Sequence, residues 1–143
     1  MTQKEKDLLL IKDLCSRLNT NLVCSIYRID DHGVGYRDEI LSGYCKGDIW
    51  DEFYFGDDCG IGIDNVSKIK PYLFPLESMT EEQKEEYRKV CELDTEILSK
   101  HPMDGTPFPA LYNSQDWLDV NHFDYRGLIP MGLANDATGL NIY

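Results

Sequence analysis

The fold is decided by residues 22–64, LVCSIYRIDDHGVGYRDEILSGYCKGDIWDEFYFGDDCGIGID. Short runs rich in β-branched and aromatic residues alternate here with turns made of glycine and aspartate. The runs predict strands at residues 22–29, 39–46, 49–55 and 61–63. Turns as short as 47–48 and 56–58 leave no room for the crossover helices that parallel strands need. The sequence therefore predicts an antiparallel meander of about four strands.

Two segments outside the meander have the pattern of amphipathic helices. Thr2 and Glu5 have the spacing of a capping box, and apolar residues then recur at helical intervals as far as Leu18. A second capping box begins at Thr80 and predicts a helix that ends near Lys100. The buried stripe of this second helix is expected to contain Tyr87, Val90, Cys91, Ile97 and Leu98.

The remaining segments are shorter and richer in proline and glycine. Residues 70–76 contain two prolines, which cannot donate to a strand ladder, so we expect a sheet edge or a surface connector there. Residues 103–113 are expected to form a loop, and Ser114 is predicted to cap a short third helix that carries Trp117. Residues 128–143 are expected to pack as an irregular segment.

These elements and the length of the chain indicate one α+β domain that covers residues 1–143. We expect the antiparallel sheet to pack against two main helices, near residues 3–18 and 81–99, with the short third helix and the irregular C-terminal segment completing the domain.

The acidic residues are concentrated in the middle of the chain. The net charge is −12, and residues 30–64 hold ten acidic residues against two basic ones. Such a surface repels nucleic acid and anionic lipid and attracts basic proteins, so we expect a basic protein partner, no direct nucleic-acid binding and no membrane association. If the acids lie on opposite faces, they only keep the protein soluble. The candidate binding residues are Asp38, Asp48, Asp51, Glu52, Asp57 and Asp58.

The lack of a recognisable targeting signal and the pattern of cysteines both favour a location in the cytoplasm. Residues 1–7 lack the basic-then-apolar pattern of a signal peptide, and the longest apolar run, residues 8–11, is too short to span a membrane. The five cysteines are odd in number and contain no close pair, which disfavours a disulfide framework and a zinc site. We expect reduced thiols.

Motifs for metals and cofactors are not evident in the sequence. The histidines His32, His101 and His122 are far apart, and the acids of residues 57–64 lack the spacing of a calcium loop. Gly60 and Gly62 are not followed by the third glycine of a nucleotide-binding turn. We therefore expect no metal and no cofactor.

One polar cluster is a candidate catalytic site. His122, Asp124 and Arg126 lie within five residues, and a carboxylate can orient an imidazole while a guanidinium binds an anion. The competing interpretation is structural: the three side chains satisfy each other and nearby backbone groups while Phe123 and Tyr125 anchor the core. The structural interpretation is favoured, and enzyme activity is left open.

Two stretches carry a resemblance to other proteins. Residues 70–82, KPYLFPLESMTEE, and residues 116–134, DWLDVNHFDYRGLIPMGLA, resemble a group of small uncharacterised acidic proteins of phages and mobile elements from anaerobic gut bacteria. In that group a basic residue usually stands at the position of Phe74. The resemblance implies an accessory protein that acts by binding other proteins, and it brings no catalytic residue with it.

The sequence thus supports three functional hypotheses. The first is a non-catalytic, phage-like accessory or regulatory protein that binds a partner through its acidic surface. The second is an inhibitor that mimics nucleic acid and blocks a host nuclease or defence protein. The third is a small hydrolase or nucleotide-processing enzyme that uses His122, Asp124 and Arg126.

Overall fold

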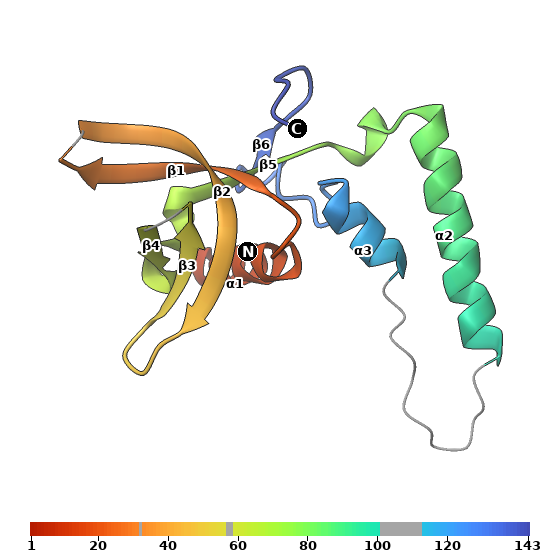
Figure 1. Cartoon of the computed structure of the whole chain (residues 1–143), viewed down its shortest axis with the longest axis horizontal. Coiled ribbons are helices and arrows are strands. Elements are labelled where there is room, and N and C mark those ends of the chain that lie inside the picture. Colours follow the sequence, from red (N-terminus) through yellow and green to blue (C-terminus); the bar gives the residue numbers. More distant parts are fainter. Residues whose placement is uncertain (32, 57–58, 101–112) are drawn as a thin grey trace.

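A computed structural model describes residues 1–31, 33–56, 59–100 and 113–143 (Figure 1). Helices are labelled α, short 3-10 helices η and strands β. In chain order the elements are α1 (Gln3–Ser16), β1 (Val23–Asp30), β2 (Gly33–Lys46), β3 (Asp51–Phe55), β4 (Cys59–Gly62), η1 (Ile63–Lys68), β5 (Ile69–Leu73), η2 (Leu76–Ser78), α2 (Glu81–Lys100), α3 (Asn113–Val120) and β6 (Asn135–Asp136).

The two predicted capping boxes are both present. The Thr2 hydroxyl accepts a hydrogen bond from the Glu5 amide, and the Glu5 carboxylate accepts one from the Thr2 amide. Thr80 and Gln83 make the same reciprocal pair before α2. Each box satisfies backbone amides that have no partner inside the helix, which is why both helices begin where the sequence predicts.

The strands form one six-stranded mixed sheet with the order β4-β3-β2-β1-β5-β6. The neighbours from β4 to β5 are antiparallel, whereas β6 runs parallel to β5. The α+β class is therefore confirmed, whereas the expected antiparallel meander is only partly right, because β6 adds a parallel pairing and makes the sheet mixed. The expected count of about four strands was too low, because β5 and the two-residue β6 extend the sheet beyond β1.

Strand β2 is longer than predicted. It begins at Gly33 rather than at Glu39, and it pairs with β1 from Gly33 to Ile40 and with β3 from Leu41 to Lys46. A bulge between Leu41 and Gly43 marks the change of partner. The β1–β2 hairpin consequently extends away from the rest of the sheet as a two-stranded ribbon (Figure 1).

The prediction for residues 70–76 was wrong, because Ile69–Leu73 forms β5 inside the sheet, between β1 and β6. Pro71 lies opposite Cys24 of β1. The Val23 amide points toward the β5 side, where the Tyr143 hydroxyl accepts its hydrogen bond, so the backbone groups of Cys24 point the other way, toward β2. Pro71 therefore sits where the ladder with β1 requires no amide.

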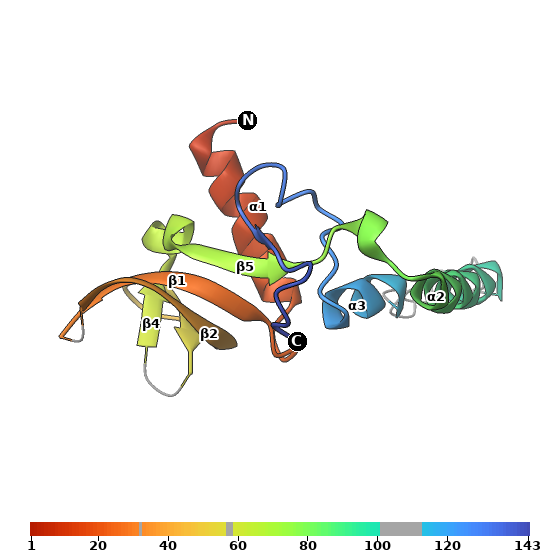
Figure 2. The same cartoon turned by 90° about the horizontal axis from the view of Figure 1, so that it is seen from above.

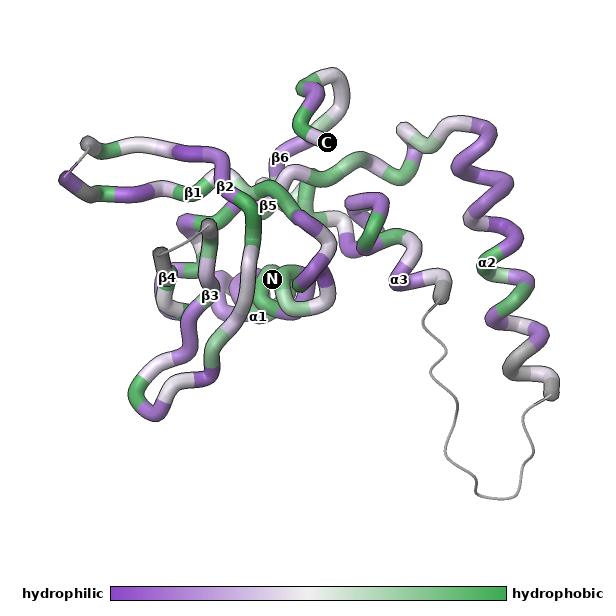
Figure 3. The backbone as a smooth tube through the Cα atoms, viewed as in Figure 1, coloured by the Kyte–Doolittle hydropathy of each residue, from purple (hydrophilic) through white to green (hydrophobic). Residues whose placement is uncertain are grey.

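The predicted packing of the second helix was also wrong. α2 stands apart from the sheet and packs against α3, where the rings of Tyr87 and Trp117 lie 5.5 Å apart (Figure 1). Tyr87, Val90 and Cys91 are half-buried, as a stripe on this side requires, and the side chains of Ile97 and Leu98 lie outside the described part. The charged residues along the rest of α2 appear purple in Figure 3.

The core lies between α1 and one face of the sheet. Leu10 and Leu14 of α1 pack with the inward-facing side chains of the strands, and Figure 2 shows α1 lying beside β5. The buried strand residues in this core are Cys24, Ile26, Leu41, Phe53, Phe55, Ile69 and Leu73. No helix in the described ranges is both long and apolar enough to span a membrane. The loop expected at 103–113 falls almost entirely outside these ranges.

Candidate functional site

His122 is the first of the three candidate catalytic residues. Its backbone has a φ of +60°, its side chain is 7% exposed, and its ring stacks on Tyr143 with centroids 3.9 Å apart. Its Nδ1 atom has no hydrogen-bond partner among the described residues. Burial, together with the positive charge of Arg17, lowers the pKa of His122 to about 4. The imidazole is therefore neutral at pH 7.

Asp124 has a structural set of partners. Its two carboxylate oxygens accept hydrogen bonds from the backbone amides of Leu128 and Ile129, each at 2.8 Å. The backbone amide of Asp124 donates to the Phe74 carbonyl at 2.8 Å. Asp124 thus closes the turn that follows it and fastens this turn to the segment after β5.

Arg126 points toward α1. Its Nη1 atom donates to Asp13 at 2.7 Å and to the Ser16 hydroxyl at 3.1 Å, and its guanidinium lies 4.4 Å from the centre of the Tyr125 ring. The contacts of His122, Asp124 and Arg126 therefore lead to three separate groups of partners. These contacts favour the structural interpretation of the motif.

Asp13 of α1 and Arg17, the C-cap of this helix, form a fully buried ion pair. The Arg17 Nε atom donates to one Asp13 oxygen at 2.9 Å and its Nη2 atom to the other at 3.1 Å, and both side chains are 0% exposed. Arg17 Nη2 also donates to the Phe123 carbonyl at 2.7 Å. The pair therefore joins α1 to the C-terminal part of the chain.

Asp119 completes this buried ion network. It accepts hydrogen bonds from the Tyr125 hydroxyl at 2.9 Å and from the Ser16 hydroxyl at 3.3 Å, and it lies 3.7 Å from Arg17 Nη1. Burial raises the pKa of Asp119, opposed by Arg17 and by the Tyr125 hydrogen bond. We call this set the buried ion network, and its members are Asp13, Ser16, Arg17, Asp119, Tyr125 and Arg126.

The buried ion network was not predicted from the sequence, although α1 carries a signal for it. Asp13 and Arg17 are four residues apart and lie beside Leu10 and Leu14, which places two opposite charges on the apolar side of the helix. Two carboxylates and two guanidiniums balance each other here. Since Asp13 and Arg17 are closed to solvent, the network fits a role in stability.

Two candidate acids on β3 are engaged with aromatic donors. Asp51 accepts a hydrogen bond from Tyr44 at 2.7 Å, which is the main reason that the pKa of Tyr44 rises to about 12. Glu52 accepts hydrogen bonds from Trp50 Nε1 at 2.5 Å and from Tyr54 at 3.0 Å. Asp51 and Glu52 are adjacent in a strand, so their side chains point to opposite faces of the sheet.

The other candidate acids are dispersed. Asp38 is exposed on β2 and accepts a hydrogen bond from Tyr72 at 3.0 Å, whereas Asp48 is exposed in the turn between β2 and β3. Asp57 and Asp58 lie outside the described residues. Of the four described candidate acids, Asp38 and Glu52 share the sheet face opposite α1.

That face, which we call the outer face, is also unusually apolar for a solvent-exposed surface. Ile29 is 72% exposed, Val34 65%, Tyr36 62% and Ile40 48%. Ile29 lies directly opposite Val34, and the rings of Tyr27 and Tyr36 meet edge to face 5.2 Å apart. On the two strands of the hairpin the outer face comprises Val23, Ser25, Tyr27, Ile29, Val34, Tyr36, Asp38 and Ile40.

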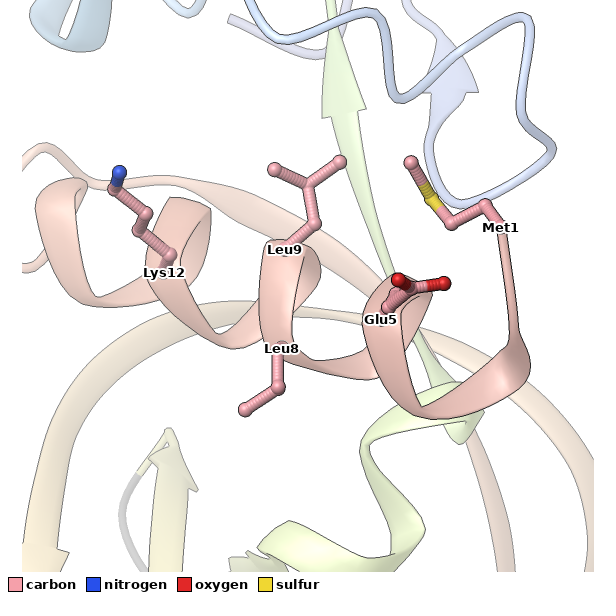
Figure 4. Close-up of a pocket in the computed structure, with 5 residues that line it drawn as sticks. All are labelled: Met1, Glu5, Leu8, Leu9 and Lys12. Atoms are coloured by element: carbon pink, nitrogen blue, oxygen red, sulfur yellow. The ribbon is translucent and has the colours of Figure 1, made fainter.

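A second apolar feature lies along α1. A groove of about 580 Å³ is lined by Met1, Glu5, Leu8, Leu9 and Lys12, and Figure 4 shows Leu8 and Leu9 projecting from opposite sides of the helix. The Glu5 carboxylate in this groove already belongs to the capping box with Thr2. The groove offers apolar contact but brings no convergent polar groups together.

Metal and redox sites are equally unsupported in the part that the structure describes. There, no three histidine, cysteine or acidic side chains gather in a way that could hold a metal ion. The four cysteines with described side chains, Cys15, Cys24, Cys45 and Cys91, are free thiols.

Comparison of the chain with protein-family models, curated proteins and solved structures found no match.

Proposed function

We propose that this protein is a non-catalytic accessory or regulatory protein that binds another protein through the outer face and its acidic residues. The observation that carries the proposal is the row of exposed apolar side chains on β1 and β2. Contiguous exposed apolar side chains on a soluble protein commonly mark an interaction site. The resemblance of residues 70–82 and 116–134 to phage and mobile-element proteins supports an accessory role in such a context.

The position of the acids supports a basic partner. Asp38 lies among the apolar residues of the outer face, and Glu52 lies on the same face of the sheet. Charges across a protein interface are arranged to complement each other, so these two carboxylates favour basic side chains on the partner. With a net charge of −12, the whole molecule would also attract a basic partner over a distance.

The proposal is tested by affinity capture with two matched variants. Ile29→Ser with Val34→Ser removes two apolar side chains from the outer face, and Leu8→Ser with Val120→Ser removes two of similar exposure elsewhere. We expect the control variant to capture the same protein as the native chain from a low-salt lysate of the source organism, and the outer-face variant to lose it. Equal capture by both variants, or no captured protein with the native chain, contradicts the proposal.

A further inference from the structure

Half of β2 has an open edge. The Leu41 amide donates to the Leu22 carbonyl on the β1 side, whereas the Ile40 carbonyl accepts from the Gly56 amide on the β3 side. Backbone groups alternate in direction along a strand, and the register of β2 against β1 is continuous from Gly33 to Ile40. The backbone amides and carbonyls of Val34, Tyr36 and Asp38 therefore point away from β1.

No strand among the described residues occupies this edge. β3 pairs with β2 only from Leu41 onward, so the ladder on that side ends before Asp38. The hairpin also projects from the sheet, which keeps the edge accessible (Figure 1). A strand edge of this kind is a template for pairing with another chain, and proteins usually blunt such edges with proline, lysine or a covering segment. Residues 33–40 contain no proline and no lysine.

The side chains of the same residues define what could pair there. Val34 and Tyr36 are 65% and 62% exposed, and Asp38 is exposed beside them on the outer face. A strand added to this edge would place its own side chains directly opposite these three. Aromatic and β-branched side chains are the favourable neighbours of Val34 and Tyr36, and a basic side chain is the favourable neighbour of Asp38.

We propose that the edge of β2 at Val34, Tyr36 and Asp38 binds an extended basic segment of a partner protein as an added β-strand. This inference rests on the proposed function and names the form of the partner. The backbone supplies hydrogen bonds that any extended chain can make, and the alternating side chains supply the preference for basic and β-branched residues. A second copy of this chain is the less favourable occupant, because it would bring another net charge of −12 to the edge.

The test uses residue-resolved amide hydrogen exchange of the full chain at low salt. The probe is a capped peptide of about six residues, lysine–threonine–valine–threonine–valine–lysine, close to the usual length of a strand. Its first, third and fifth side chains share one face and would lie opposite Asp38, Tyr36 and Val34 of an antiparallel neighbour. We expect the peptide to slow exchange at the amides of Val34, Tyr36 and Asp38 by at least about tenfold, which corresponds to about 1.4 kcal/mol. The amides of Gly35 and Arg37 point toward β1 and should not change, which provides an internal control.

Two control peptides separate backbone pairing from charge. A version N-methylated at alternate residues keeps its lysines but cannot complete a ladder, and a version with glutamate in place of lysine keeps the backbone but reverses the charge. We expect neither to protect the three amides. Asp38→Asn should weaken binding of the lysine peptide several-fold, whereas Asp48→Asn, in the turn between β2 and β3, should leave it unchanged.

The outcomes distinguish this inference from the proposed function. Binding without alternating protection, or equal binding of the N-methylated peptide, overturns the added strand but leaves the outer face as a binding surface. Protection of the edge amides that increases with protein concentration in the absence of peptide assigns the edge to a second copy and overturns the basic partner. Absence of binding up to about 1 mM peptide, a free energy of only about −4 kcal/mol, overturns the inference outright.

Discussion

His122 makes the stability of this protein sensitive to mild acid. Its pKa is about 4 in the folded chain, against about 6.5 for an unperturbed histidine, so between these values the unfolded chain binds a proton that the folded chain does not. The contribution of neutral His122 to the free energy of unfolding is therefore fully present above about pH 6.5. It is lost as the pH decreases toward 4, and the loss is on the order of 3 kcal/mol.

The substitution His122→Asn provides the control for this prediction. Asparagine tolerates the positive φ of this position but does not titrate. We expect urea unfolding of the native chain to show the loss between pH 6.5 and 4, and the variant to show a flatter profile in the same range. Parallel profiles would mean that groups other than His122 cause the acid sensitivity. Asp119 would not be among them, because burial raises its pKa and protonation of such a group favours the folded chain as the pH falls.

The Asp13–Arg17 pair tests the role of the buried ion network. Asp13→Ala would leave the buried guanidinium of Arg17 without its carboxylate, and removing one partner of a buried pair typically costs about 3–5 kcal/mol. The exposed pair of Glu85 and Arg88 on α2 is the matched control, and Glu85→Ala should cost less than about 1 kcal/mol. Chemical denaturation measures both, and equal losses would contradict the assigned role.

At the scale of elements, α2 is held by a row of aromatic rings. Trp117 stacks on Phe123 with centroids 5.7 Å apart and an interplanar angle of 9°, and its other neighbour is Tyr87 of α2. Phe123 continues the row to Phe74, whose ring lies 6.2 Å away. The row links α2 and α3 to the segment after β5.

Trp117→Ala should release α2 while leaving the sheet folded. Because Trp117 is only half-buried, we expect a loss of about 2 kcal/mol, below the roughly 3–5 kcal/mol of a fully buried ring. Hydrogen exchange should accelerate in α2 and remain slow in β1. Uniform acceleration in both elements would show that α2 unfolds only together with the sheet.

The sequence predicted those elements whose signals are local. The capping boxes at Thr2 and Thr80 fixed the starts of α1 and α2, because a cap depends on residues three positions apart. The place of β5 could not be predicted from its own residues. Pro71 fits inside the sheet only because the backbone groups of Cys24, opposite it on β1, point away from β5 and need no amide from it. The apolar stripe of α2 predicted that one side of the helix is buried, but it did not identify α3 as the element that covers this side.

Site residues were harder to predict than elements. His122, Asp124 and Arg126 alternate along the chain, and proximity in sequence gave no information on the direction of each side chain. The partners of Arg126 lie on α1, more than a hundred residues earlier. The outer face had a readable signal, the alternation of Val34, Tyr36, Asp38 and Ile40, but Gly33 and Gly35 obscured it by suggesting a turn.

At the scale of the whole molecule, a net charge of −12 produces self-repulsion. Salt shortens the reach of exposed charges to about 8 Å at physiological ionic strength. We therefore expect the melting temperature to rise by about 2–4 °C between low and physiological salt, which corresponds to about 1 kcal/mol for a chain of this size. A melting temperature that falls with salt would show that attractive surface pairs outweigh the repulsion.

The positions of the two tryptophans have an optical consequence. Trp50 is 58% exposed beside the β2–β3 turn, whereas Trp117 lies in the aromatic row that holds α2. Water around an indole shifts its fluorescence to longer wavelengths and admits collisional quenchers, so acrylamide should extinguish the red component from Trp50 before the blue component from Trp117. Each emission band therefore observes a different part of the molecule: the sheet at the β2–β3 turn, and the seam between α2 and α3.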